Sequence, residues 1–249
     1  MKQTTRRILF DILQIAVLIV VVIVLWYVVA LIFHSELILP QPHNVLKITF
    51  SLLARPATYL ALLYTLLRAV AAFILSVGFA ILLALCVGVY DKSAFYVNAI
   101  VTFLRALPTI AIILITLILF NSAITPVIVA FLVTFPIVYS VFQREFVRNE
   151  KLLQVCKVYE VKVGKKIKYA LFPLIQDELL TLVKDNLPLC IKIVVAGEAL
   201  ALPLYGIGRQ MYVAKVNLET ANVVALTILT LIVCFALSSI VSLCQRKKI

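Results

Sequence analysis

Charged side chains interrupt an apolar run between residues 178 and 202, where a membrane-crossing chain would bury them. Lys192 and Glu198 lie deepest in the run, and Lys184 lies nearer its start. An ionised side chain at the centre of a membrane helix costs about 2.5 to 3.5 kcal/mol on insertion scales, so it usually faces protein or water. Charges of both signs also fall on shared helical stripes, where we expect opposite signs to pair. Lys184, Lys192 and Glu198 are therefore candidates for a polar translocation pathway.

An alternative assigns the first charges of this run to the membrane surface. Residues 177, 178, 184 and 185 are charged and close to its start, where a lysine can extend its ammonium group to water. The deeper pair, Lys192 and Glu198, favours the pathway interpretation. Pro108 is a further candidate in the pathway, as a hinge, although an ordinary helix kink would also explain it. Arg68 and Arg105 could shape the pathway or anchor the ends of spans, and we favour anchoring.

One long segment, residues 144 to 177, is polar enough to lie in water. Within it the apolar residues Leu152, Val155 and Val158 recur at helical spacing, with lysines between them. The pattern predicts two short amphipathic helices joined by a turn near Gly164. Such a helix could lie on a membrane or bind in a groove of a partner. A basic loop that only sets membrane topology would have the same composition.

The composition is that of an integral membrane protein. Of the 249 residues, 64% are hydrophobic and only 14% are charged, whereas about a quarter are charged in ordinary soluble domains. Long unbroken apolar runs favour membrane helices over the alternating strands of a barrel. The net charge of +12 comes mainly from loops between these runs, so topology explains it better than nucleic-acid binding. The five cysteines show no paired CxxC spacing.

The chain is predicted to be a single all-α polytopic membrane domain, residues 1 to 249, with about six transmembrane helices. The expected spans are residues 12–33, 59–90, 103–120, 124–142, 178–202 and 221–243. Pro40 and Pro42 are expected to break any helix after the first span, and Pro126 and Pro136 to break the fourth. Residues 203–217 are expected to form a loop too polar to span. In this topology most lysines and arginines lie on the same side of the membrane as the two termini. Because cytoplasmic loops carry an excess of lysine and arginine, the termini and residues 144–177 are predicted to lie in the cytoplasm.

The polar segment resembles the cytoplasmic motif of type I ABC importer permeases, which reads EAA, three residues, G, nine residues, I, one residue, LP. The residues at the marked positions are Gln154, Val155 and Cys156 for EAA, Glu160 for G, Ala170 for I, and Phe172 and Pro173 for LP. The spacing fits, and Pro173 is identical. Glu160 stands where the family has glycine, and a positive φ is costly for a residue with a Cβ. The departure from the family's residue implies either a reshaped contact at this turn or a degenerate subunit.

The flanking sequence is similar to the nitrate, sulfonate and taurine importer group, which also includes transporters of vitamin precursors. The matching fragments appear in the family's order from residue 39 to the last span. They are Leu39, Pro40, Pro42 and Val45; Thr65, Leu66, Arg68 and Phe73; Leu104, Arg105 and Pro108; Pro136 and Ile137; Leu182, Val183 and Lys184; Gly197 and Glu198; and Gly206, Ile207 and Gly208.

The resemblance implies that residues 155 to 162 form a coupling helix that binds in a cleft of a cytoplasmic ABC ATPase dimer. The ATPase-coupling residues would be Gln154, Val155, Cys156, Lys157, Val158, Tyr159, Glu160, Val161 and Lys162. It further implies a second permease copy or a paralogue, an extracytoplasmic solute-binding protein, and a location in the cell membrane among its lipids. The transported solute would be a small anion, such as a sulfonate or nitrate, or a vitamin precursor.

No set of residues typical of an enzyme or a cofactor site is present in the sequence. Gly206 and Gly208 lack the lysine and serine or threonine of a phosphate-binding loop, so ATP and Mg²⁺ are expected in the partner ATPase. A Ser, His and Asp set or an HExxH motif at membrane depth is missing, and His34 and His43 have no companion metal ligands. The alternative from another class is an ion-coupled secondary carrier or channel that uses the charges of residues 178–202.

Overall fold

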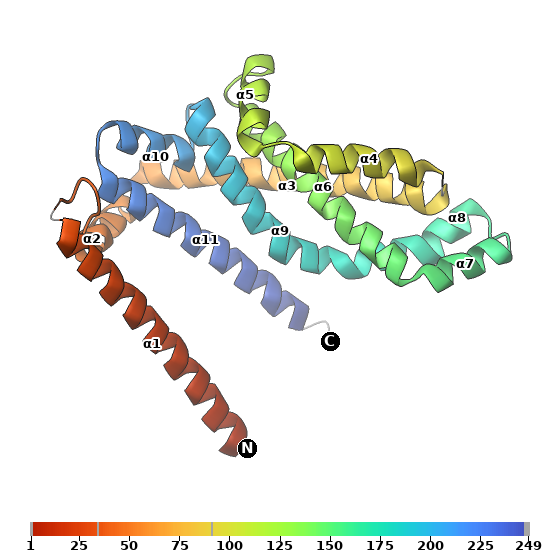
Figure 1. Cartoon of the computed structure of the whole chain (residues 1–249), viewed down its shortest axis with the longest axis horizontal. Coiled ribbons are helices and arrows are strands. Elements are labelled where there is room, and N and C mark those ends of the chain that lie inside the picture. The colour runs from red at the N-terminus through yellow and green to blue at the C-terminus, as the bar shows by residue number, and fades with distance from the viewer. Residues whose placement is uncertain (1, 34, 91, 247–249) are drawn as a thin grey trace. The chain divides into compact units, whose positions relative to one another are not determined.

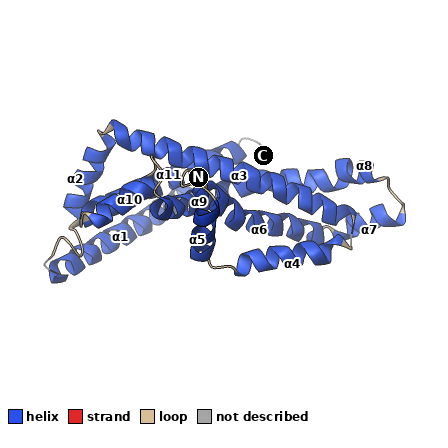
Figure 2. Cartoon of the chain, turned by 90° about the horizontal axis from the view of Figure 1, so that it is seen from above, coloured by secondary structure: helices blue, strands red, loops and turns tan. Residues whose placement is uncertain are grey.

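The structure is a computed structural model, and it describes residues 2–33, 35–90 and 92–246. Helices account for 86% of the chain, and the described residues contain no strand, so the all-α prediction is confirmed (Figures 1 and 2). The side chains of residues 2–9, 11, 12, 15, 16, 177 and 244–246 are not described, and His34 and Asp91 lie outside the described residues altogether. The prediction for the Asp177 side chain therefore lies outside what the structure describes.

The chain divides into two compact units. Unit 1 contains residues 1–56 and 211–229, and unit 2 contains residues 57–210 and 230–249. Unit 1 includes α1 (Lys2–Phe33) and α2 (Pro42–Leu53). Trp26 donates from Nε1 to the Pro40 carbonyl at 3.2 Å, and Thr220 donates to the Leu37 carbonyl at 2.5 Å. Both hydrogen bonds are made to the segment that connects α1 and α2, and they hold this segment in place within unit 1.

The prediction that Pro42 breaks any helix is wrong, because Pro42 is the first residue of α2. Proline is well suited to that position, since the first helical residues need no N–H donor and the ring fixes φ near the helical value. The buried residues of α2 recur at helical spacing, as expected for an amphipathic helix: Pro42, Val45, Thr49 and Leu52.

Unit 2 holds the remaining elements, which are arranged around α6 and α9. They are α3 (Pro56–Val89), α4 (Ser93–Ala106), α5 (Thr109–Leu119), α6 (Thr125–Arg148), α7 (Glu150–Val158), α8 (Val163–Lys166), the π-helix η1 (Ile167–Leu171) and α9 (Phe172–Ala201). They are followed by α10 (Ile207–Val216) and α11 (Thr220–Arg246), each of which has residues in both units. The α6 and α9 helices make the most extensive packing interface in the chain.

A stripe of small residues lets α3 approach its neighbours closely. Its buried members are Ala61, Thr65, Ala69, Ala72, Ser76, Ala80 and Ala84. Ser76 donates to the Phe131 carbonyl of α6 at 3.3 Å, and the Phe79 ring meets the Phe131 ring edge-on at 5.5 Å. Small residues at helix contacts are typical of membrane proteins, where close backbone approach replaces hydrophobic burial as the source of packing energy.

In the described part of the chain, three helices are long and apolar enough to cross a membrane: α3, α6 and residues Thr220–Leu243 of α11. The α4 and α5 helices make a fourth if the bent pair counts as one span. These are features of a membrane protein. The third predicted span is thus corrected: it is two helices that meet at 96°, with Pro108 at the break.

Two other predictions about helix breaks are wrong. Residues 125–148 form one continuous helix, α6, with Pro126 in its first turn and Pro136 accommodated inside it. Pro136 has no N–H group to donate to the carbonyl one turn earlier. Membrane helices tolerate such a proline when neighbouring helices, side chains or water satisfy that carbonyl. The region expected to be a loop, residues 203–217, contains the helix α10.

Candidate functional site

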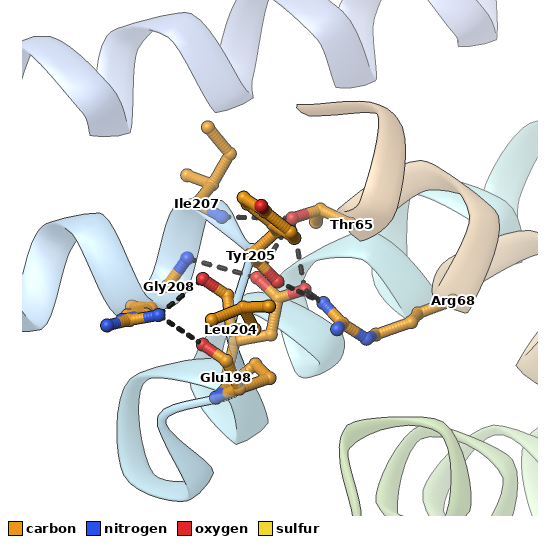
Figure 3. A network of polar contacts seen from close by, with 9 residues as sticks. Thr65, Arg68, Glu198, Leu204, Tyr205, Ile207 and Gly208 are labelled. Carbon is orange, nitrogen blue, oxygen red and sulfur yellow. Dashed lines mark hydrogen bonds and ion pairs between the residues drawn. The ribbon is translucent and has the colours of Figure 1, made fainter. Parts of the chain in front are cut away.

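A buried carboxylate near the end of α9 is the centre of the densest polar network in unit 2. The Glu198 side chain is 0% exposed. Arg68 of α3 donates to it from Nη1 at 2.6 Å, and Thr65 donates from Oγ1 at 2.8 Å to Oε2. The Gly208 N–H at the start of α10 donates to Oε2 at 3.1 Å (Figure 3). A buried charge is tolerated only when it is paired and hydrogen-bonded, and all these partners supply that compensation.

The same network holds the loop between α9 and α10 onto α3. Arg68 also donates to the Tyr205 carbonyl at 2.6 Å, and Thr65 accepts the Ile207 N–H at 3.0 Å (Figure 3). The Tyr64 ring of α3 stacks on the Tyr205 ring with 5.1 Å between centroids. The loop is therefore joined to α3 and α9 by an ion pair, several hydrogen bonds and an aromatic contact. We refer to Thr65, Arg68, Glu198, Tyr205, Ile207 and Gly208 as the Glu198 clasp.

The clasp requires glycine at two positions because the loop backbone lies against the carboxylate. A Cβ on Gly206 would lie 2.5 Å from the Glu198 carboxyl carbon, which real contacts do not allow. A Cβ on Gly208 would overlap the Val195 carbonyl and approach the Ala199 nitrogen to 2.7 Å. The second clash is with backbone atoms, which cannot rotate away as a side chain can.

Gly208→Ala is expected to lower the free energy of unfolding by about 1 to 3 kcal/mol, the usual cost of overpacking. Gly78→Ala is the matched control, because no atom lies within 4 Å of a Cβ at that position in the middle of α3. That variant should be neutral or stabilised by up to about 1 kcal/mol from helix propensity. Denaturation of both variants in the same detergent measures the difference. Equal stabilities would show that the α9–α10 loop does not pack as described.

The clasp bears on two predictions. For Arg68 we favour anchoring of a span end; in the structure its side chain is 11% exposed and forms an ion pair with Glu198 of α9. Opposite charges of α9 could pair within a stripe, but among the described residues Glu198 pairs with Arg68 of α3, and no ion pair joins two charges of α9. No pattern in the sequence indicates the Arg68–Glu198 pair, because the packing of α3 against α9 creates it.

The other candidate pathway residues are not brought to the clasp. Lys184 is half-buried, and its carbonyl accepts a hydrogen bond from Ser238 Oγ of α11 at 3.1 Å. Lys192 is exposed on α9, and Pro108 is exposed at the break between α4 and α5. Among the described residues neither Lys184 nor Lys192 forms an ion pair with Glu198.

The α7 helix presents a row of apolar residues to the outside. Leu152 is 44% exposed, Val155 52% and Val158 78%, and Tyr159 at the helix end is 76% exposed. The less exposed residues of α7 are Leu153 and Cys156, which are half-buried. Glu150, Gln154 and Lys157 are exposed and lie at the edge of a pocket of about 340 Å³ against α3, α4 and α6. We refer to the exposed apolar residues Leu152, Val155, Val158 and Tyr159 as the α7 stripe.

The predicted boundaries of this helix are wrong. The helix ends at Val158, so the expected helix over residues 155–162 combines its last turn with a connection, and Gly164 lies inside α8 rather than in the turn. The Val161 N–H donates to the Cys156 carbonyl at 3.0 Å, and the Glu160 N–H donates to the Lys157 carbonyl at 3.2 Å. These two bonds define a Schellman helix terminus, whose residue in the left-handed conformation is usually glycine.

Glu160 occupies that left-handed position with φ 46°. The cost expected for a non-glycine residue at positive φ is therefore present in this structure.

Two substitutions at Glu160 measure this strain. Glu160→Gly should raise stability by up to about 1 kcal/mol, since relief of the left-handed strain exceeds the extra entropy of an unfolded glycine. Glu160→Val should lower it by about 1 to 2 kcal/mol, because a β-branched residue is poorly tolerated at positive φ. Thermal unfolding of the two variants in detergent gives the comparison. If the Glu160→Val variant were as stable as the Glu160→Gly variant, residue 160 would not have the left-handed conformation.

Comparison of the sequence with protein-family models and with curated proteins finds no match.

Proposed function

We propose that this chain is the membrane-spanning permease subunit of an ATP-binding-cassette importer. It would carry a small solute, an anion or a vitamin precursor, inward by alternating access. The observation that carries the proposal is the outward-facing α7 stripe, which ends in a Schellman turn with its left-handed residue at the motif's glycine position. An exposed amphipathic helix of this kind fits a groove in a partner protein.

The arrangement suits the transmission of force. Closure of two ATPase subunits must reach the membrane helices as a rigid-body movement. The α7 helix is joined to α6 at Asn149 with almost no intervening loop, and α8 and η1 lead directly into α9. A push on α7 would thus be delivered to α6 and α9, the two helices that form the core of unit 2.

The subunit would be no enzyme, and it would work with partners. ATP and Mg²⁺ would be bound by a cytoplasmic ABC ATPase dimer, and a solute-binding protein outside the membrane would deliver the solute. A second copy of the chain or a paralogue would complete the pathway in the cell membrane. The six-span topology, with both termini in the cytoplasm, belongs to this proposal.

Purification of the chain from its own membrane under mild detergent tests the proposal. We expect an ATPase with a phosphate-binding glycine-rich loop to copurify, and ATP hydrolysis to accompany it. Uptake by intact cells should then stop on ATP depletion and persist when the ion gradient is collapsed. A chain that purifies without an ATPase, and whose uptake follows the ion gradient instead, would contradict the proposal.

An ion-coupled carrier is the second candidate, and the charge placement on α9 favours it specifically. Lys192 is an exposed cation on a helix that also contains the fully buried Glu198. Ionisable residues within membrane helices commonly mark ion pathways. The ion-gradient measurement above separates the two candidates, because only the carrier loses uptake when the gradient is removed and ATP remains.

A further inference from the structure

An open pocket of about 530 Å³ lies between α4 and α6, separate from the Glu198 clasp. It is situated towards the end of α6 that carries Arg148, and its lining is rich in polar groups. Asn98 of α4 accepts the hydroxyl proton of Tyr139 at 2.9 Å, which fixes one wall. Pockets of this size hold small ligands or part of a larger one.

Two guanidinium groups converge on one residue of this pocket. Arg105, in the last turn of α4, donates from Nη1 to the Ser140 hydroxyl at 3.2 Å. Arg144, one turn further along α6, donates from Nε to the Ser140 carbonyl at 3.3 Å. Both cations are therefore held close to the same residue and line the same pocket. Like charges placed together repel, so the arrangement favours an anion between or beside them.

Neither arginine forms an ion pair with a described carboxylate, although Arg144 also lines a separate pocket that contains Glu145, Glu178 and Asp185. The ion pairs of the described chain, at 4.0 Å or less, join Arg68 to Glu198 and Arg148 to Glu145. No aspartate or glutamate lines the pocket. Arg105 and Arg144 thus keep most of their donors available, and a guanidinium presents these donors in a fork that matches the oxygens of phosphate or carboxylate.

We propose that this pocket binds an oxyanion group of the phosphate type, held by the guanidinium groups of Arg105 and Arg144. The group is carried either by a soluble anion or by the headgroup of an anionic phospholipid. The volume leaves room for the remainder of the ligand beyond the oxyanion. The proposal depends on the pocket alone and does not require the chain to act with an ATPase.

Binding by the purified full-length chain in nanodiscs tests the proposal in two arms. In the first arm the nanodiscs contain only phosphatidylcholine, and inorganic phosphate is titrated by calorimetry at constant ionic strength with sodium chloride. In the second arm the chain is purified from membranes containing phosphatidylglycerol, and the retained lipid is measured by native mass spectrometry. The variants are Arg105→Gln and Arg144→Gln, and the matched control is Arg148→Gln, which removes an arginine from the same helix outside the pocket.

We expect each pocket variant to weaken binding by about 10- to 100-fold, the equivalent of one charge-assisted hydrogen-bonded contact. Arg148→Gln should change the binding affinity less than twofold. Unchanged unfolding midpoints would show that the variants remain folded. If binding of inorganic phosphate is lost in the Arg105→Gln variant, the ligand is a soluble anion. If retention of phosphatidylglycerol is lost in that variant, the ligand is a lipid headgroup. Absence of binding in both arms, or equal losses in all three variants, would overturn the proposal.

This outcome is independent of the proposed function. A chain that binds phosphate through Arg105 and Arg144 but purifies without an ATPase would sustain the pocket and refute the importer. A chain that copurifies with its ATPase yet binds neither probe would sustain the importer and refute the pocket.

Discussion

Glu198→Ala is expected to lower the free energy of unfolding by about 3 to 5 kcal/mol, the usual cost of breaking a buried ion pair by removing one partner. The loss leaves the Arg68 guanidinium, on a side chain that is only 11% exposed, without its carboxylate. It also removes the acceptor for the Thr65 hydroxyl and the Gly208 N–H. Such a loss is a large fraction of the total stability of most proteins. Reversible unfolding of the purified chain in mixed micelles measures it.

Glu178→Ala is the matched control for that measurement. Glu178 is a half-buried carboxylate on the same helix, and it forms no ion pair among the described residues. Its removal should change stability by about 0.5 kcal/mol or less. The double variant Arg68→Met, Glu198→Leu should recover part of the lost stability, because neither charge is then left unpaired. If Glu198→Ala and Glu178→Ala were equally stable, Glu198 would not be enclosed as described.

Tyr159→Asp is expected to weaken association with the ATPase by about 30-fold or more, which is the effect of losing an interface hot spot worth about 2 kcal/mol. The Tyr159 ring is 76% exposed at the end of the α7 stripe. An aspartate there would have to lose its hydration inside an apolar groove, so the substitution opposes binding directly. Membrane insertion and the unfolding midpoint should stay unchanged, because the ring has few contacts within the chain. Copurified ATPase per permease is the measurement.

One control accompanies this variant. Tyr159→Phe keeps the apolar surface and should retain association. Normal ATPase recovery with Tyr159→Asp, at normal expression, would show that the α7 stripe is not the docking surface.

Helices could be predicted from the sequence where the apolar runs are long. The residues at which those helices begin and end could not be predicted. Residues 59–90 were expected as a span and form α3, because a run of that length has no other stable state in lipid. The break between α4 and α5 could not be located, since Arg105 and Pro108 fit a straight helix as well as a bent one. Pro42 was misread because proline ends a helix or begins one according to its position, and the sequence alone does not give that position.

The sequence indicated that Glu198 belongs to a functional site, but it did not indicate which side chains contact Glu198. Glu198 was expected to be important because a carboxylate in an apolar run needs compensation. Its partner Arg68 is 130 residues away along the chain, and that contact is created by the packing of α3 against α9. The end of α7 was missed for a different reason. Schellman turns are recognised by glycine, and here the left-handed residue is Glu160.

A photo-reactive side chain placed at Val158 tests the central claim most directly. Val158 is 78% exposed on the α7 stripe, whereas Gln154 lines the chain's own pocket. After irradiation of intact membranes, we expect the probe at Val158 to join the chain to an ATPase with a phosphate-binding glycine-rich loop, identified by mass spectrometry. The probe at Gln154, which is exposed at the edge of the pocket, should give more links within the chain and fewer to the ATPase than the probe at Val158. Links from Val158 to lipid or to the chain itself, with no ATPase, would contradict the account.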